Sequence, residues 1–207
     1  MAGSSAIRVP PGRAGVLQLR RRLSVAEAGA ELLTRKLTVL STEAERLTAR
    51  AAETGRRWQD TAVPAQHSLG LAGQLAGDRG FRLAALAPEA RVTTTDTSLM
   101  GLRYPAGADC FLPERSDGDA SPAEAALWCA DQAVRAAVRT AAVHAAAMRA
   151  AETVSREVAL TRRRLRALEH RRIPALREAL RLAYARVEEA EAADALLRRW
   201  AADRPPG

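Results

Sequence analysis

The sequence predicts an all-α protein: a long antiparallel two-helix coiled coil with a small middle head that can hold a short β-hairpin. Three observations support this fold class. Apolar or small residues recur in alternating steps of three and four from residue 16 to residue 51. A second long helical stretch begins near residue 121. Aromatic residues make up only 3% of the 207 residues, so a wide globular core would lack the large side chains that usually fill it.

The first predicted element is an N-terminal coiled-coil helix over residues 13–60. It begins after Val9-Pro10-Pro11-Gly12, because proline cannot sit inside a helix without losing a hydrogen bond. Spacing of this kind keeps one narrow stripe, the seam, against a partner helix and implies a left-handed supercoil. Gly29 and Gly55 flank the seam, where they either admit a close partner or are tolerated surface glycines. The seam residues are Val16, Leu19, Leu23, Ala26, Ala30, Leu33, Leu37, Leu40, Ala44, Leu47 and Ala51.

The second element, over residues 61–120, is the middle head region. Prolines such as Pro64 and several glycines interrupt the repeat, so short helical turns are expected within 69–86. Residues 91–97 are rich in β-branched side chains and predict a strand, with 99–104 as its partner in a hairpin spanning 91–105. The polar stretch 113–119 predicts a mobile loop.

The third element is a C-terminal coiled-coil helix over residues 121–203. Ser121, Pro122 and Glu124 form a capping box with proline at the first helical position. The phase of the repeat jumps between Leu168 and Ile173, beside Pro174, which predicts a kink at 171–174. Its seam residues are Val154, Val158, Thr161, Leu165 and Leu168, then Ile173, Leu176, Leu180, Ala183, Val187 and Ala190.

Two long helices joined by a compact segment can fold back on each other, which predicts a monomeric hairpin. In the expected register, Val16 lies near the end of the second helix and Leu33 faces 175–182. Charge favours this arrangement over a parallel homodimer, which would set three consecutive arginines against their own copies. The charges expected to meet are Arg20, Arg21 and Arg22 with Glu188, Glu189, Glu191 and Asp194.

The net charge of +8 and the pI of about 10.9 leave two interpretations open. One is binding to nucleic acid or an anionic membrane. The other is an arginine-biased composition with solvated helix faces, which is favoured because no aromatic residues interleave with the arginines. The longest alanine-rich stretch, 123–151, is interrupted by Asp131, Arg135, Arg139 and Arg149 and should not cross a bilayer. The N-terminus has no apolar segment typical of a secretory signal, so a cytosolic protein is expected.

No group of residues predicts catalysis, a cofactor or a metal site. His67, His144 and His170 are far apart in sequence, and the glycine-rich stretch 70–80 lacks the lysine of a phosphate-binding loop. Cys110 and Cys129 have neither CxxC spacing nor a neighbouring histidine.

Three blocks of sequence resemble the D subunit of the V-type and A-type rotary ATPases, the central rotor axle. The first joins Val9-Pro10-Pro11-Gly12-Arg13 to the leucine- and arginine-rich run 17–23 and to 31–36. The second is Ser98-Leu99-Met100-Gly101-Leu102-Arg103-Tyr104-Pro105, similar to a Met-Gly-Val-x-Val-Pro segment. The third is 161–170 followed by Ile173-Pro174, which is similar to an Asn-Arg-Arg-Val-Asn-Ala-Leu-Glu block and its Ile-Pro.

The resemblance implies a non-catalytic central-stalk protein that couples ATP hydrolysis or synthesis to ion translocation. Its implied partners are the catalytic A and B subunits, the F subunit of the stalk and a socket protein of the membrane rotor. One copy per complex is implied, cytoplasmic and peripheral to the membrane, with no cofactor, nucleic acid or direct membrane insertion. The rival functions are an arginine-rich nucleic-acid-binding coiled coil and a self-associating scaffold. The residues expected to contact the hexamer are Pro11, Arg13, Arg20, Arg21, Leu196, Leu197 and Arg198. Those expected to be structural are Leu19, Leu23, Leu33, Leu37, Leu40, Leu165, Leu168, Ile173 and Pro174.

Overall fold

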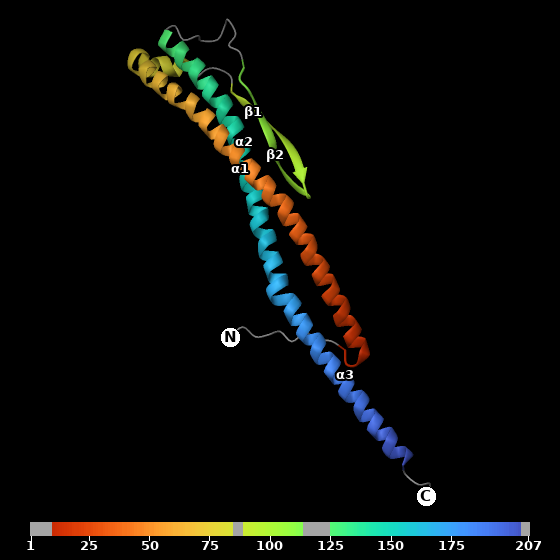
Figure 1. The fold of residues 1–207 in the computed structure, drawn as a ribbon. Helices are drawn as coiled ribbons and strands as arrows, with labels where there is room; N and C mark the ends of the chain where they lie inside the picture. The colour runs from red at the N-terminus through yellow and green to blue at the C-terminus, as the bar shows by residue number, and fades with distance from the viewer. Residues whose placement is uncertain (1–9, 85–88, 114–124, 204–207) are drawn as a thin grey trace. The chain divides into compact units, whose positions relative to one another are not determined.

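The computed structural model describes residues 10–84, 89–113 and 125–203 (Figure 1). A long helix, a two-stranded hairpin and a second long helical stretch follow one another, which confirms the predicted fold class. The elements are α1 (Arg13–Ala84), β1 (Arg91–Leu99), β2 (Leu102–Phe111), α2 (Ala125–Ala167), the π-helix η1 (Leu168–Arg172) and α3 (Ile173–Ala202). The chain divides into two compact units: Met1–Leu37 with Ala159–Gly207, and Thr38–Val158. We call them the terminal unit and the middle unit.

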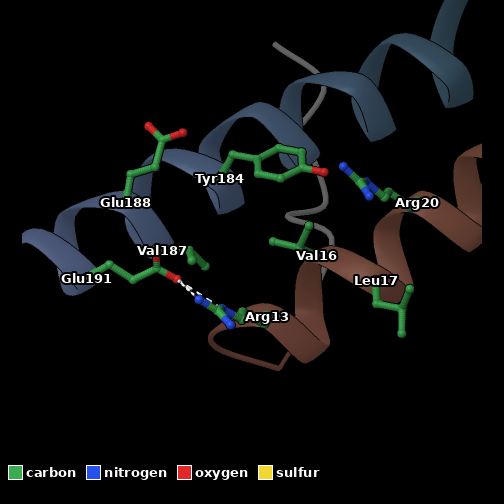
Figure 2. A pocket seen from close by; sticks show the side chains of 8 residues that line it. All are labelled: Arg13, Val16, Leu17, Arg20, Tyr184, Val187, Glu188 and Glu191. Carbon is green, nitrogen blue, oxygen red and sulfur yellow. Dashed lines mark hydrogen bonds and ion pairs between the residues drawn. The ribbon is translucent and has the colours of Figure 1, made fainter.

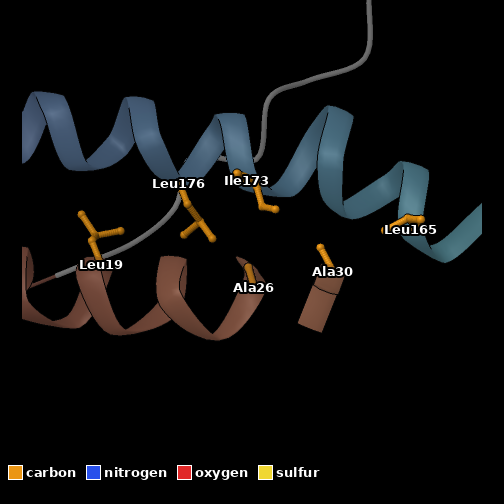
Figure 3. Close-up of a cluster of buried hydrophobic side chains, with 6 residues drawn as sticks. All are labelled: Leu19, Ala26, Ala30, Leu165, Ile173 and Leu176. Carbon is orange, nitrogen blue, oxygen red and sulfur yellow. The ribbon is translucent and has the colours of Figure 1, made fainter. Parts of the chain in front are cut away.

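The core of the terminal unit is a line of aliphatic side chains between the start of α1 and the antiparallel stretch formed by the end of α2 and by α3 (Figure 3). Leu19 and Leu176 point toward each other and are essentially inaccessible to solvent. Full burial of a leucine stabilises the fold by about 1.5–3 kcal/mol. Small side chains at Ala26 and Ala30 face Ile173 and Leu165 and let the helices approach closely. Leu23, Leu33, Leu37 and Leu168, all predicted structural residues, pack around this core.

The predicted break in phase takes the form of a π-helical turn. The backbone N–H of Ile173 donates to the carbonyl of Leu168, five residues back, whereas an α-helix would use the residue four back. The turn adds one residue, so the seam position that follows the half-buried Leu168 is Ile173, which is buried, and not Arg172, which is exposed. Pro174 then falls in the first turn of α3, where its missing N–H is best tolerated.

The register of the terminal unit differs from the predicted one. Arg177 donates to Glu27 at 2.7 Å, and a Cβ atom on Gly29 would lie 4.0 Å from Leu168. Leu33 therefore lies beyond Leu168 along the pair, and its expected position opposite 175–182 is wrong. Val16 lies beside Val187, well before α3 ends at Ala202. Apolar packing along the seam sets the register, because the exposed charges that guided the prediction contribute little to the free energy of folding.

In the middle unit, α1 continues through Pro64, so the helical stretch is longer than the predicted 13–60. Ala65 and Ala72 beyond the proline are buried, and Ala72 packs with Leu127 and Ala130 of α2. This burial offsets the hydrogen bond that proline removes. The helical path breaks at Gly77, whose φ of 59° falls in the left-handed region that favours glycine.

The strands β1 and β2 pair antiparallel from Arg91 with Phe111 to Leu99 with Leu102. The predicted hairpin is confirmed, and it extends beyond the predicted end at residue 105. Met100 and Gly101 form the two-residue turn, both with positive φ, as turns matched to the twist of a hairpin require. The register shifts between Thr95 and Asp96, where a bulge lets Pro105 enter the ladder.

A polar cluster fixes β2 against α1 in the middle unit. The hydroxyl of Tyr104, itself buried, donates to Glu43 at 2.8 Å, and Arg46 donates to both oxygens of the same carboxylate at 2.6 and 2.8 Å. Arg50 donates to the carbonyl of Ala106 at 2.8 Å. The hydrogen bond from Arg46 lowers the pKa of the Glu43 carboxyl, and burial raises the pKa of the Tyr104 hydroxyl. Both shifts favour the protonation states that form this cluster at neutral pH.

Two further contacts hold α2, one to α1 and one to the segment that follows β2. Thr61 and Thr140 share a hydrogen bond of 2.6 Å, and Arg135 donates to the carbonyl of Pro113 at 3.0 Å. The predicted capping box at 121–124 and most of the predicted loop 113–119 lie outside the described residues. Among the described helices, none is long and apolar enough to cross a membrane.

Candidate partner-binding site

The candidate site lies in the terminal unit where α1 begins, facing residues 184–191 of α3, and it includes the part of α3 that continues beyond them to Ala202. Gly12 has a φ of 78°, and its carbonyl accepts from the backbone N–H groups of Gly15 and Val16, which starts the helix. Pro11 precedes this turn and is exposed. The turn directs Arg13, the first residue of α1, toward α3 (Figure 2).

Arg13 and Glu191 form an ion pair between α1 and α3. Nε and one terminal nitrogen of the guanidinium donate to the same carboxylate oxygen at 2.9 and 2.6 Å. Both side chains are more than half exposed, so the pair stabilises the fold by about 0–1 kcal/mol. It closes one side of a shallow cleft of about 410 Å³ (Figure 2). Eight residues line this cleft: Arg13, Val16, Leu17, Arg20, Tyr184, Val187, Glu188 and Glu191.

Arg20 lies over the face of Tyr184 on the other side of the cleft. Its guanidinium carbon is 5.1 Å from the ring centroid, within the range of a cation–π interaction. The Tyr184 hydroxyl is shielded from solvent and has no hydrogen-bond partner within the described residues. Arg20 is therefore fixed by an aromatic ring and not by the acidic residues that the sequence suggested.

Beyond the cleft, α3 carries an exposed apolar patch. Leu196, Leu197 and Trp200 are 65%, 63% and 64% exposed. Their spacing of three and four residues sets them on one face of the helix. Large apolar side chains gathered on an exposed face are typical of a surface that another protein covers.

The structure brings together some of the predicted contact residues. Arg13 and Arg20 line the cleft, and Leu196 and Leu197 belong to the apolar patch. Pro11, Arg21 and Arg198 are exposed, and none of them lines the cleft. Sequence reasoning did not single out Tyr184 or Trp200. It placed Val187 on the seam and Glu191 among the acidic residues facing Arg20, but it assigned neither of them to the contact site. The helical spacing of 184, 187, 188 and 191 could have indicated a shared face, as could a tryptophan within an alanine-rich segment.

The arrangement suits protein docking. Within the part of the chain that the structure describes, no three His, Cys, Asp or Glu residues gather as metal ligands would. Cys110 and Cys129 are free thiols. In the terminal unit, the start of α1 and α3 form an antiparallel helical pair with an exposed apolar patch near the end of α3.

Comparison with known families identifies the hairpin. The model of the family of ATP synthase D subunits matches residues 15–201, nearly the whole chain. The chain therefore belongs to the ATP synthase D-subunit family, whose members are non-catalytic stalk components of rotary ATPases. The resemblance noted in the sequence is thereby confirmed. No curated protein matches the chain closely enough to count as a relative.

Proposed function

We propose that the chain is the central rotor shaft of a V/A-type rotary ATPase. It couples ATP hydrolysis or synthesis in a hexamer of A and B subunits to the translocation of H⁺ or Na⁺. Family membership over 15–201 supports this function, together with the exposed apolar patch at the end of α3. The F subunit of the stalk and a socket protein of the membrane rotor complete the proposed partners, with one copy of the chain in each complex.

The apolar patch is the proposed contact with the hexamer. Each leucine that passes from water into a partner surface contributes about 1.5–3 kcal/mol of favourable transfer free energy. Arg13 and Arg21 near the start of α1 and Arg198 beside the patch on α3 are exposed cations that suit polar contacts at the rim of such an interface. Leu196 and Leu197 are therefore the proposed anchors, and the arginines set orientation.

The coupling of shaft rotation to the catalytic cycle follows from the asymmetry of a helical pair. An antiparallel pair presents different side chains in each direction, here an Arg13–Glu191 ion pair on one side of the cleft and Arg20 on Tyr184 on the other. Three catalytic interfaces around such a shaft meet different surfaces. Each orientation then favours a different set of site conformations, which links rotation to the catalytic cycle.

Reconstitution with the other subunits in vesicles tests the proposal. The full complex should pump ions on addition of ATP, and a complex lacking this chain should not. The double substitution Leu196→Ala with Leu197→Ala should reduce ATP-driven pumping several-fold. Leu75→Ala is the control, because Leu75 is 62% exposed but lies in the middle unit. Full pumping by the complex without the chain would reject the shaft function.

The charge of +8 supports the rival function of nucleic-acid binding. That function requires tight binding to duplex DNA, with an affinity that falls steeply with salt. The shaft function requires only weak, non-specific DNA binding. A titration of the full chain with a fluorescent duplex at two salt concentrations separates the two functions.

A further inference from the structure

Six arginines gather around the outer surface of the terminal unit where α2 passes into η1. All six are exposed, while the neighbouring seam residues Thr161, Leu165 and Ile173 are buried. Within 162–172 the only acidic residue is Glu169. Because the arginines occupy successive positions around the helix, they cover its solvent side and not one narrow stripe. We call this set the basic collar: Arg162, Arg163, Arg164, Arg166, Arg171 and Arg172.

The collar differs from the nearest arginines on either side of it in the same helical stretch. Arg156 pairs with Glu152 at 2.8 Å, Arg177 with Glu27 at 2.7 Å and Arg181 with Glu178 at 2.7 Å. No collar arginine forms an ion pair with any residue that the structure describes. Within the described residues, carboxylates thus pair with the nearest arginines before and after the collar but not with the collar itself.

Unpaired like charges so close together repel one another and lower the stability of the folded chain. The repulsion is relieved when carboxylates from another molecule approach. Arginine suits this contact, since its planar guanidinium can bind a carboxylate through two parallel hydrogen bonds. The collar therefore has the charge, the exposure and the donor geometry of a surface that receives an acidic partner.

We propose that the collar docks an acidic protein surface on the catalytic hexamer, at a level separate from the apolar patch. This inference rests on the proposed shaft function. The thirty residues of α3 separate the collar from the end of that helix, a distance of about 45 Å at 1.5 Å per residue. The apolar patch and the collar would thus contact the hexamer at two positions along the helix axis.

Two other polyanions fit the collar less well. Residues 162–172 contain no Phe, Tyr or Trp, and the imidazole of His170 is the one ring there, so bases would have no row of large rings to stack on. The exposed large apolar residues on either side are Leu160 and Leu182, and none lies between them. A membrane surface would therefore meet charge without the apolar face that normally enters the headgroup layer.

The test compares the full chain with a collar variant that carries Arg162→Gln, Arg163→Gln, Arg164→Gln and Arg166→Gln. The control variant removes the same charge from exposed arginines of the middle unit, through Arg56→Gln, Arg79→Gln, Arg82→Gln and Arg149→Gln. The probe is a reconstituted hexamer of A and B subunits from the same cell, titrated at 50 and 200 mM salt. Thermal unfolding of each variant reports whether it folds.

The collar variant should bind the hexamer at least tenfold more weakly at 50 mM salt and show a smaller salt dependence. It should also unfold at the same or a higher temperature than the parent, because repulsion is removed. Equal hexamer binding by parent and collar variant, or an equal loss in the control variant, would overturn the collar inference and leave the shaft function intact. Failure of the parent chain to bind the hexamer would reject both. If the chain binds duplex DNA more tightly than the hexamer, and this binding depends on the collar, the collar's partner is nucleic acid and not an acidic protein.

Discussion

The imidazole of His144 on α2 stacks against the indole of Trp58 on α1, with ring centroids 5.6 Å apart and planes inclined by 17°. Nδ1 of the same ring shares a hydrogen bond of 3.2 Å with the hydroxyl of Thr54. The ring fits because residue 55 is glycine: a Cβ atom there would lie 3.1 Å from Cε1 of His144. One histidine thus occupies the space that a missing side chain leaves on the facing helix.

Gly55→Ala should destabilise the middle unit, because the imidazole must move and weaken its contacts with Trp58 and Thr54. Gly29→Ala is the matched control, since its added Cβ would meet Leu168 at 4.0 Å, an ordinary contact distance. Alanine exceeds glycine in helix propensity by about 1 kcal/mol, so the control should be stabilised by about that amount. Thermal unfolding of both variants measures the contrast. Equal stabilisation of the two variants would show that the packing of the His144 ring does not depend on glycine at residue 55.

Tyr104→Phe should loosen the attachment of β2 by removing the hydrogen bond to Glu43, at a cost of about 1 kcal/mol. Hydrogen exchange of the β1 and β2 amides measures the effect. Tyr184→Phe is the control, since the Tyr184 hydroxyl has no partner within the described residues. Removal of the Tyr184 hydroxyl should leave the exchange rate of the β1 and β2 amides unchanged or lower. Faster exchange of the hairpin in the control alone would contradict the assignment.

The same cluster predicts how the stability of the middle unit depends on pH. The pKa of Glu43 is lowered in the fold, so its stabilising contribution is present above the unfolded value of 4.5 and is lost as pH falls through the folded value. The pKa of Tyr104 is raised, so its contribution is present below 10.0 and is lost as pH rises through the folded value. Unfolding free energies of the parent and Glu43→Gln should therefore differ most between about pH 5 and pH 10. A constant difference down to pH 3 would refute the link.

Thr161→Val should stabilise the terminal unit. Thr161 is fully buried on the seam, and its hydroxyl has no hydrogen-bond partner within the described residues. Valine has nearly the same shape and removes a desolvated polar atom that costs about 1–3 kcal/mol. The melting temperature should rise by about 2–4 °C for each kcal/mol recovered. Thr54→Val is the control and should lower it, since the Thr54 hydroxyl bonds to His144 and to backbone carbonyls.

Crosslinking tests the register and the monomeric hairpin together. In a variant with Cys110 and Cys129 replaced by serine, Glu27→Cys with Arg177→Cys should crosslink within one chain through a short bis-maleimide, because these positions form an ion pair. Leu33→Cys with Leu180→Cys should not, since Leu33 lies further along the pair. Crosslinks that join two chains at low protein concentration would favour the self-associating scaffold.

The sequence was sufficient to predict the helices and the hairpin, because heptad spacing and β-branched runs are local signals. Leu19, Leu165, Ile173 and Leu176 were all identified as seam residues from their spacing, and all are buried. Local signals do not fix how far two helices slide along each other. The pairing of Glu27 with Arg177 follows from packing summed over the whole seam, so charge matching gave a displaced register.

The site was less predictable for the same reason. Arg13 and Arg20 were singled out as exposed cations, but their partners Glu191 and Tyr184 are more than 160 residues away in sequence. Tyr104 likewise was named only within a predicted strand and a family block, and its hydrogen bond to Glu43 depends on where β2 docks. The continuation of α1 through Pro64 was missed because burial of Ala65 and Ala72 overrides a local breaker.

The π-helical turn at 168–172 holds one more residue than an α-helical turn would, without rotating the seam residues that follow it. A residue added to an ordinary helix rotates every later side chain by about 100° and would turn Leu176 and Leu180 out of the contact. Here the surplus residue is confined to a single wide turn, and the side chains on both sides keep their facing partners. Insertions and deletions in relatives should therefore concentrate at this turn, where a change of one residue leaves the helix interface in register.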